Sequence, residues 1–201
     1  MQRRIIPISS QFMQALREAI APFHDEAENA GPLSAIPAKT ISLEEYRKIL
    51  ERLYGFVFIA ENVVEPLVKH SGLDYGKRIR VDHLVKDLRF LGNASESFNE
   101  LSICQDMPVI KNTAQGLGLL YLFEGSRLGG LVLSKVLKEH FGLKNYRGYS
   151  YFASNGAEVT TMWASFKNFM ENFVCIKGGG DEIIATSKES FALFNKWLAG
   201  S

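Results

Sequence analysis

The segment Tyr121–Leu133, YLFEGSRLGGLVL, is an apolar, helix-like run with three glycines in its middle. Glycine inside a helix costs roughly 1 kcal/mol relative to alanine, so a chain that accepts three of them needs a compensating reason. Gly125 and Gly129 are four positions apart and clear one helical face, which lets backbone approach a flat partner or another helix. The apolar flanks indicate that the segment is buried. The pattern predicts a platform for a planar ligand or a tight helix crossing.

Length and charge exclude several classes of protein. The 201 residues suit a single domain, 1–201, with its core at about 10–199. The 23 basic and 22 acidic residues give no basic field for nucleic acid. No apolar stretch approaches the roughly 20 residues of a membrane span, and the N-terminus lacks the apolar core of a signal peptide. Cys104 and Cys175 form no disulfide framework or metal motif. We therefore expect a cytoplasmic protein with two free thiols, no membrane span and no nucleic-acid partner.

Helical periodicity dominates the rest of the chain and predicts an all-α, single-domain fold. Ser9 or Ser10 is the expected cap of a first helix that ends near Asn29, and Ser42 with Glu45 forms a capping box for a second. The expected helices are 10–29, 42–70, 82–91, 113–140, one from 155 through 169, and 181–198 with Ile184 and Phe194 among its inward residues. Residues 94–112 are expected to be loop with one helical turn, and the tyrosine-rich stretch 145–154 an ordered loop.

The first helix carries a candidate ligand-binding face. Arg17, His24 and Glu28 lie at spacings of seven and four, so they project from roughly one side. A histidine that binds metal through one nitrogen usually gives its other N–H to a carboxylate, directly or through water, and Glu28 is placed for that. The same spacing occurs on many solvated helices, so alone it favours an ordinary surface. The other three histidines are expected at helix ends, where surface or cap residues are common: His70, His83 and His140.

Two segments together resemble a known family. Leu16–Ala30, LREAIAPFHDEAENA, resembles the proximal-helix motif of haem oxygenases, and Tyr121–Gly130 is similar to their glycine-rich distal helix. Segments 45–56, 151–166 and 190–198 fit the bacterial branch that often serves phytochromes. The resemblance runs from about residue 16 to 198. It implies a helical bundle with haem between the first helix and a glycine-kinked distal helix.

The resemblance also assigns roles to individual residues. His24 falls on the proximal iron ligand and Glu28 on the carboxylate that orients it. Gly125 and Gly129 fall where the distal backbone approaches the oxygen site, with Gly130 adjoining. For the haem propionates it implies contacts from Arg17, Lys167 and Tyr121.

One position departs from the family pattern. Many members carry an acidic residue directly after the first distal glycine, where it organises water, and this chain has Ser126 there. Glu124 lies on the other side of Gly125, and successive helix positions point about 100° apart, so Glu124 cannot replace that acid. Ser126 can still hold one or two waters.

The implied activity is cleavage of haem, which is both cofactor and substrate, to biliverdin, CO and iron. It requires O₂ and electrons from an external donor such as a ferredoxin or a reductase, and a phytochrome is an implied receiver of the biliverdin. Two alternatives remain at this stage. One is a haem carrier or sensor without turnover, which Ser126 leaves open. The other is a helical interaction domain in which the glycines serve only a helix crossing.

Overall fold

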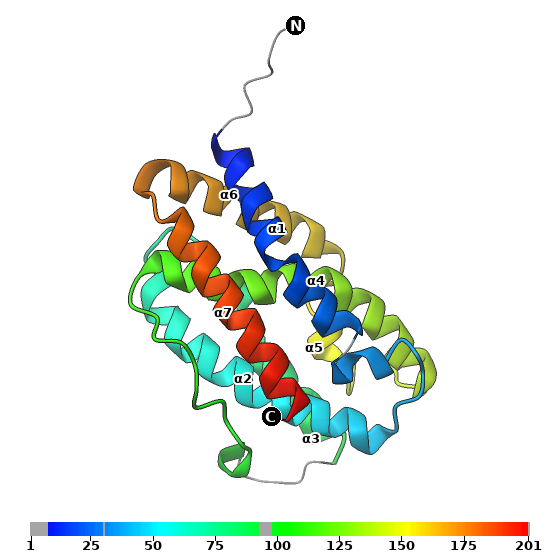
Figure 1. Cartoon of the computed structure of the whole chain (residues 1–201). Coiled ribbons are helices and arrows are strands. Elements are labelled where there is room, and N and C mark those ends of the chain that lie inside the picture. The colour runs from blue at the N-terminus through cyan, green and yellow to red at the C-terminus, as the bar shows by residue number, and fades with distance from the viewer. Residues whose placement is uncertain (1–7, 30, 93–97, 201) are drawn as a thin grey trace, which may run out of the picture.

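The computed structural model of the chain describes residues 8–29, 31–92 and 98–200 (Figure 1). Expectations for the N-terminal segment 1–7 and for 93–97 lie outside the described residues. The helices are α1 (Ile8–Asn29), α2 (Leu43–Val68), α3 (Val81–Phe90), α4 (Thr113–His140), α5 (Ser150–Ala153), α6 (Val159–Lys177) and α7 (Gly180–Ala199). Short 3-10 turns occupy Pro32–Ala35, Gly76–Arg78, Phe98–Glu100 and Gly156–Glu158. The described part contains no strand, which confirms the all-α prediction.

The helix α2 begins at the predicted capping box. Ser42 N donates to Glu45 Oε2 over 2.8 Å, and Glu45 N donates to Ser42 Oγ over 3.2 Å, so two otherwise unpaired backbone donors are satisfied. The apolar face of this helix, which includes Leu50 and Val57, is fully buried. Burial of that face stabilises a helix far more than its intrinsic propensity does.

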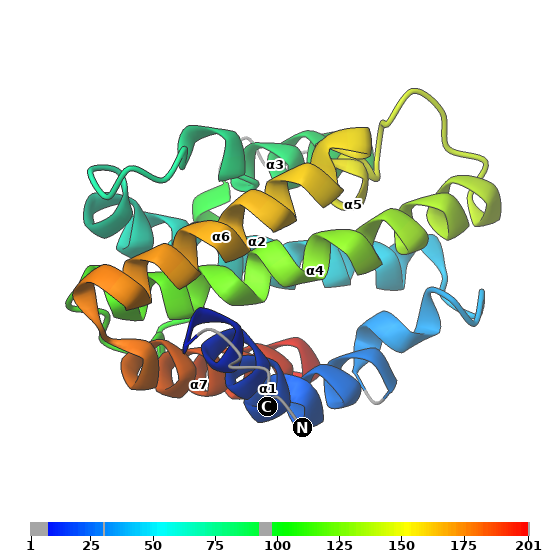
Figure 2. The same cartoon turned by 90° about the horizontal axis from the view of Figure 1, so that it is seen from above.

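The helix α4 runs through the middle of the molecule and packs against α2, α6 and α7 (Figure 2). It has the predicted bounds, it is capped by Asn112, whose Oδ1 accepts from Gln115 N over 3.0 Å, and it is continuous through its three central glycines. Close helix crossing occurs at another glycine. A Cβ on Gly118 would lie 2.7 Å from the Ile183 carbonyl oxygen of α7, so this residue lets the two helices touch.

Three expectations about the elements need correction. The helix α1 begins at Ile8, ahead of the two serines expected to cap it. The tyrosine-rich stretch contains the short helix α5, because the Asp87 carboxylate of α3 accepts hydrogen bonds from Ser150 N and Tyr151 N, each over 2.8 Å. Burial raises the pKa of Asp87, and these bonds oppose that rise. In α7 the fully buried residue is Ile183 rather than Ile184.

The helix α1 packs against α6 and α7 and does not lie along α4. In Figure 2 it is separated from the second half of α4, with the chain after α1 continuing past that half. None of the helices in the described ranges is both long and apolar enough to cross a membrane.

Candidate functional site

Two cavities lie between α1 and α4. The first, here called the apolar cavity, has a volume of about 370 Å³ and is lined mainly by aliphatic and aromatic side chains. The second, the charged cavity, has a volume of about 900 Å³ and is lined by several ionisable side chains. His24 of α1 and Gly125 of α4 line both cavities, so the two spaces meet where these residues lie.

The apolar cavity collects six of the residues singled out in the sequence. They are His24, Glu28, Gly125, Ser126, Gly129 and Gly130. Other parts of its wall come from α2, α5 and α7, for example from Leu53, Phe152 and Phe194, and from Leu33 and Pro37 after α1. Ligand pockets are commonly apolar with a few convergent polar groups, and this cavity has that character.

The charged cavity holds the other three, Arg17, Tyr121 and Lys167. The Trp163 ring lies between them, with its centroid 5.4 Å from that of Tyr121 and 5.5 Å from Lys167 Nζ. Burial raises the pKa of Tyr121, and the nearby Arg17 guanidinium acts in the opposite direction. Arg17, Lys167 and the Tyr121 phenol therefore line a common space, together with the carboxylates of Glu18 and Asp25. The two cations and the phenol suit a ligand with anionic groups.

All four histidines lie in the described part of the chain, and among them only His24 lines either cavity. Its Nδ1 lies 3.7 Å from Glu28 Oε2, with side-chain exposures of 47% and 59%. This separation is longer than a direct hydrogen bond, and it leaves Nε2 without a partner on the helix. His140 Nε2 is instead paired with the Ile41 carbonyl over 2.8 Å, and burial lowers the pKa of His83 on α3.

The three central glycines of α4 have different surroundings. A Cβ on Gly129 would meet nothing within 4 Å, and one on Gly125 would come only within 3.8 Å of the Trp163 ring. A Cβ on Gly130 would lie 3.2 Å from the Phe152 carbonyl, so that glycine packs on α5. Ser126 and Gly129 are exposed, contrary to the expected burial, because they border the cleft. Gly129 therefore faces open space, Gly125 lies beside the Trp163 side chain, and neither residue has the backbone of another helix against it.

Ser126 is held by a buried arginine that sequence reasoning missed. Arg80 is 2% exposed and lines the apolar cavity. Its Nη1 donates to Ser126 Oγ and to the Phe123 carbonyl, both over 3.3 Å, and its Nη2 donates to the Tyr151 carbonyl over 3.2 Å. The guanidinium also lies 4.0 Å from the Tyr151 ring centroid. Arginine in a short loop is normally solvated, so no local signal marked this residue.

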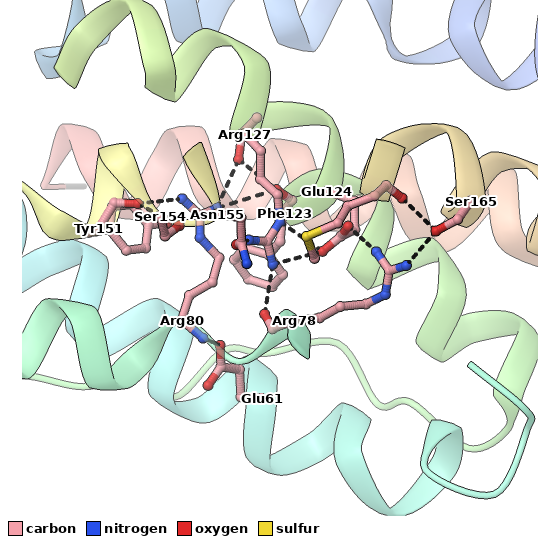
Figure 3. A network of polar contacts seen from close by, with 12 residues as sticks. Glu61, Arg78, Arg80, Phe123, Glu124, Arg127, Tyr151, Ser154, Asn155 and Ser165 are labelled. Atoms are coloured by element: carbon pink, nitrogen blue, oxygen red, sulfur yellow. Dashed lines mark hydrogen bonds and ion pairs between the residues drawn. The ribbon is translucent and has the colours of Figure 1, made fainter. Parts of the chain in front are cut away.

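An ionic network lies behind this wall (Figure 3). Glu124 is fully buried and binds Arg78 through one carboxylate oxygen and Arg127 through the other. Arg127 also donates to the Arg78 carbonyl over 2.8 Å and to Asn155 Oδ1. Glu124 therefore points away from the cleft and cannot substitute for an acid at position 126. The network instead fixes the part of α4 that carries Gly125 and Ser126.

Glu61 of α2 binds the backbone N–H of Arg80, and the pKa of this carboxyl predicts how stability depends on pH. Its Oε1 accepts from Arg80 N over 2.6 Å, and burial raises its pKa from 4.5 to about 7. Folding thus favours the protonated acid, so its contribution to stability is complete below pH 4.5 and is lost as pH rises to 7. We expect Glu61→Gln, which keeps an acceptor, to become more stable than the parent by up to about 3 kcal/mol above pH 7 and not below pH 4.5.

Urea unfolding of the parent and of Glu61→Gln at a series of pH values measures this difference. Glu65→Gln is the matched control, because Glu65 is exposed one turn further along α2. A difference from the parent that does not change with pH would contradict the role given to Glu61.

The cleft has the properties that a haem requires. One imidazole faces it from α1, a glycine face without side chains borders it from α4, one end is apolar and the other carries cations. These features suit a flat, largely apolar ligand with anionic groups at one end and a metal that accepts a nitrogen ligand. The fold and the site thus define a class of protein, a helical protein with a cleft whose lining suits haem.

Comparison with known proteins identifies the family. The haem oxygenase family profile matches residues 10–200. A haem oxygenase from Xanthomonas campestris pv. campestris (strain 8004) is 29% identical over 172 residues, which are 83% of this chain and 96% of that protein. Haem oxygenase from Leptospira interrogans has the same fold, with a TM-score of 0.78 at 16% identity over 94% of this chain and 99% of that one. Haem oxygenase-1 from Synechocystis sp. PCC 6803, solved in complex with haem, has a TM-score of 0.72 at 20% identity, over 96% of this chain and 91% of that one. The chain belongs to the haem oxygenase family.

Proposed function

We propose that this enzyme binds haem in the cleft between α1 and α4 and cleaves it to biliverdin, CO and iron, with O₂ and an external reductant. The observation that carries the assignment of the site is the placement of His24 and Gly125. They come from helices far apart in the sequence, yet both line both cavities. Family membership supports the activity, and no feature of the described residues favours a carrier or sensor.

His24 would hold the iron through Nε2, with Glu28 keeping the ring oriented, directly or through water. When bound, haem supplies an iron that activates O₂ and the ring carbon that is oxidised. The backbone at Gly125 and Gly129 leaves room on the opposite side of the ligand, because no side chain projects there.

The Ser126–Arg80 pair would order water beside this space. Ser126 Oγ donates to the Phe123 carbonyl over 2.9 Å while it accepts from Arg80. The hydroxyl can accept a further hydrogen bond from water, whereas an arginine does not give up its proton. We assign proton delivery to water held at Ser126, and to Arg80 the orientation of that hydroxyl.

Arg17 and Lys167 would bind the haem propionates in the charged cavity. A hydrogen bond to a charged group is worth roughly 1.5–3 kcal/mol, so Arg17→Ala should lower haem affinity about ten- to hundredfold. The absorption spectrum of the bound iron should stay close to that of the parent, because the axial ligand is unchanged.

Haem titration followed by absorbance measures both quantities. Arg47→Ala provides the matched control, since Arg47 is also helical, pairs with Glu51 four residues on and lines neither cavity. Unaltered affinity in Arg17→Ala would remove that residue from the propionate site.

The electrons would come from a donor protein such as a ferredoxin or a reductase. A phytochrome that takes up the biliverdin and a cytoplasmic location remain predictions from the family resemblance.

Aerobic incubation of the haem complex with ascorbate tests the proposed activity. We expect the haem absorption band to disappear while biliverdin and CO form in step with it. Haem that becomes reduced and binds O₂ but stays intact would instead indicate a carrier or sensor.

A further inference from the structure

The part of α1 that carries His24 is weakly held by the helix itself. Pro22 lies inside α1, two residues before His24. Because proline has no N–H, the Glu18 carbonyl has no helical hydrogen-bond donor from position 22. Beyond Ile20, no residue from 21 to 29 is fully buried. One missing helical bond and the lack of fully buried residues leave this last stretch less firmly held than the first half of α1, although Phe23 packs against the core. Contacts from other helices therefore matter for its position.

Asn195 of α7 supplies such a restraint. Its Nδ2 donates to the Phe23 carbonyl and to Glu26 Oε2, each over 2.9 Å. Both partners can only accept, so the orientation of the amide is fixed by its neighbours. The Phe23 carbonyl belongs to the peptide unit that also contains the nitrogen of His24. Asn195 thus holds the backbone at the point where the imidazole begins.

The α7 end of this contact is itself anchored. Trp197 Nε1 donates to the Arg52 carbonyl of α2, and Arg52 Nη1 donates to the Trp197 carbonyl, each over 2.7 Å. The Arg52 guanidinium also lies 5.7 Å from the Trp197 ring centroid. These contacts at Trp197, two residues after Asn195, hold α7 against α2. Phe191 and Phe194 of the same helix line the apolar cavity.

We propose that Asn195 is a positioning residue for His24, which ties the ligand-bearing end of α1 to the frame of α2 and α7 and so sets where the imidazole lies in the cleft. This inference rests on the proposed role of His24 as the iron ligand. It gives Asn195 no contact with haem, because that residue lines neither cavity.

Asn195→Asp tests the proposal with almost no change of side-chain shape. It replaces the donating amide by a carboxylate, which would face two acceptors, the Phe23 carbonyl and Glu26. Asn195→Leu removes the donor without adding charge and serves if the first variant folds poorly. Lys196→Ala, at the next and exposed position of α7, is the matched control. Amide exchange within α4 reports whether each variant keeps its fold.

Two readouts apply. In the haem-free protein, hydrogen exchange at residues 24–29 should become about tenfold faster in both Asn195 variants, with α4 unchanged. In the ferrous haem complex, the iron–histidine stretching band in the resonance Raman spectrum should shift or broaden in both, while Lys196→Ala retains the parent band. Parent-like exchange and a parent-like band in both variants would overturn the role of Asn195. A parent band that persists in His24→Ala would overturn the ligand assignment instead, so the two failures are distinguishable.

Discussion

His24→Ala is expected to lose the axial nitrogen ligand and to convert no measurable haem to biliverdin. Loss of a group that merely orients a metal ligand typically costs ten- to a hundredfold, so loss of the ligand itself should lower turnover more than about 100-fold. The fold should be unaffected, because His24 is exposed on α1. Absorption spectra of the haem complex and the rate of biliverdin formation measure the two effects.

Added imidazole provides a sharp control for this variant. The small ligand can enter the space that the side chain leaves in the cleft, and it should restore a nitrogen-ligated spectrum. His70→Ala is the matched surface substitution, since His70 is exposed and lines neither cavity. A parent-like spectrum in His24→Ala, or loss of ligation in His70→Ala, would show that the iron ligand is elsewhere.

Gly129→Leu is expected to fold normally and to lose haem conversion. A Cβ at this position meets no other atom within 4 Å, so a leucine can project into the cleft without displacing α4. Leucine also favours a helix by close to 1 kcal/mol over glycine, so stability should be equal or higher. The branched side chain would then occupy the space beside Gly125 that the proposed reaction needs for oxygen, whereas ligation by His24 could remain.

Thermal unfolding, the spectrum of the haem complex and the rate of biliverdin formation separate these effects. Lys135→Leu places the same side chain on an exposed position of the same helix and should act like the parent. Turnover by Gly129→Leu at the parent rate would mean that the glycine face does not border the reaction site.

Signals that are local in the chain predicted the fold well. The Ser42–Glu45 capping box and the stop after His140 each involve residues a few positions apart, so the bounds of α2 and α4 could be read directly. The short helix α5 could not, because its capping carboxylate, Asp87, lies 63 residues before Ser150. A cap supplied by another helix leaves no pattern in the neighbouring sequence.

For the site, too, local patterns predicted some residues, and tertiary packing alone revealed the others. Helical spacing and the family motifs indicated the residues that border the cleft from α1 and α4. Arg80 and Glu61 were missed, because their importance comes from burial, and burial of charge is set by tertiary packing. Asn195 was missed for a similar reason: it is separated by 172 residues from the Phe23 carbonyl that it binds.

A crystal structure of the haem complex tests the central claim most directly. We expect the porphyrin in the cleft between α1 and α4, with its iron bound to His24 Nε2, its propionates at Arg17 and Lys167, and the Gly125–Gly129 backbone on the opposite side of the ring. Haem bound outside this cleft, or ligated by any residue other than His24, would contradict the account.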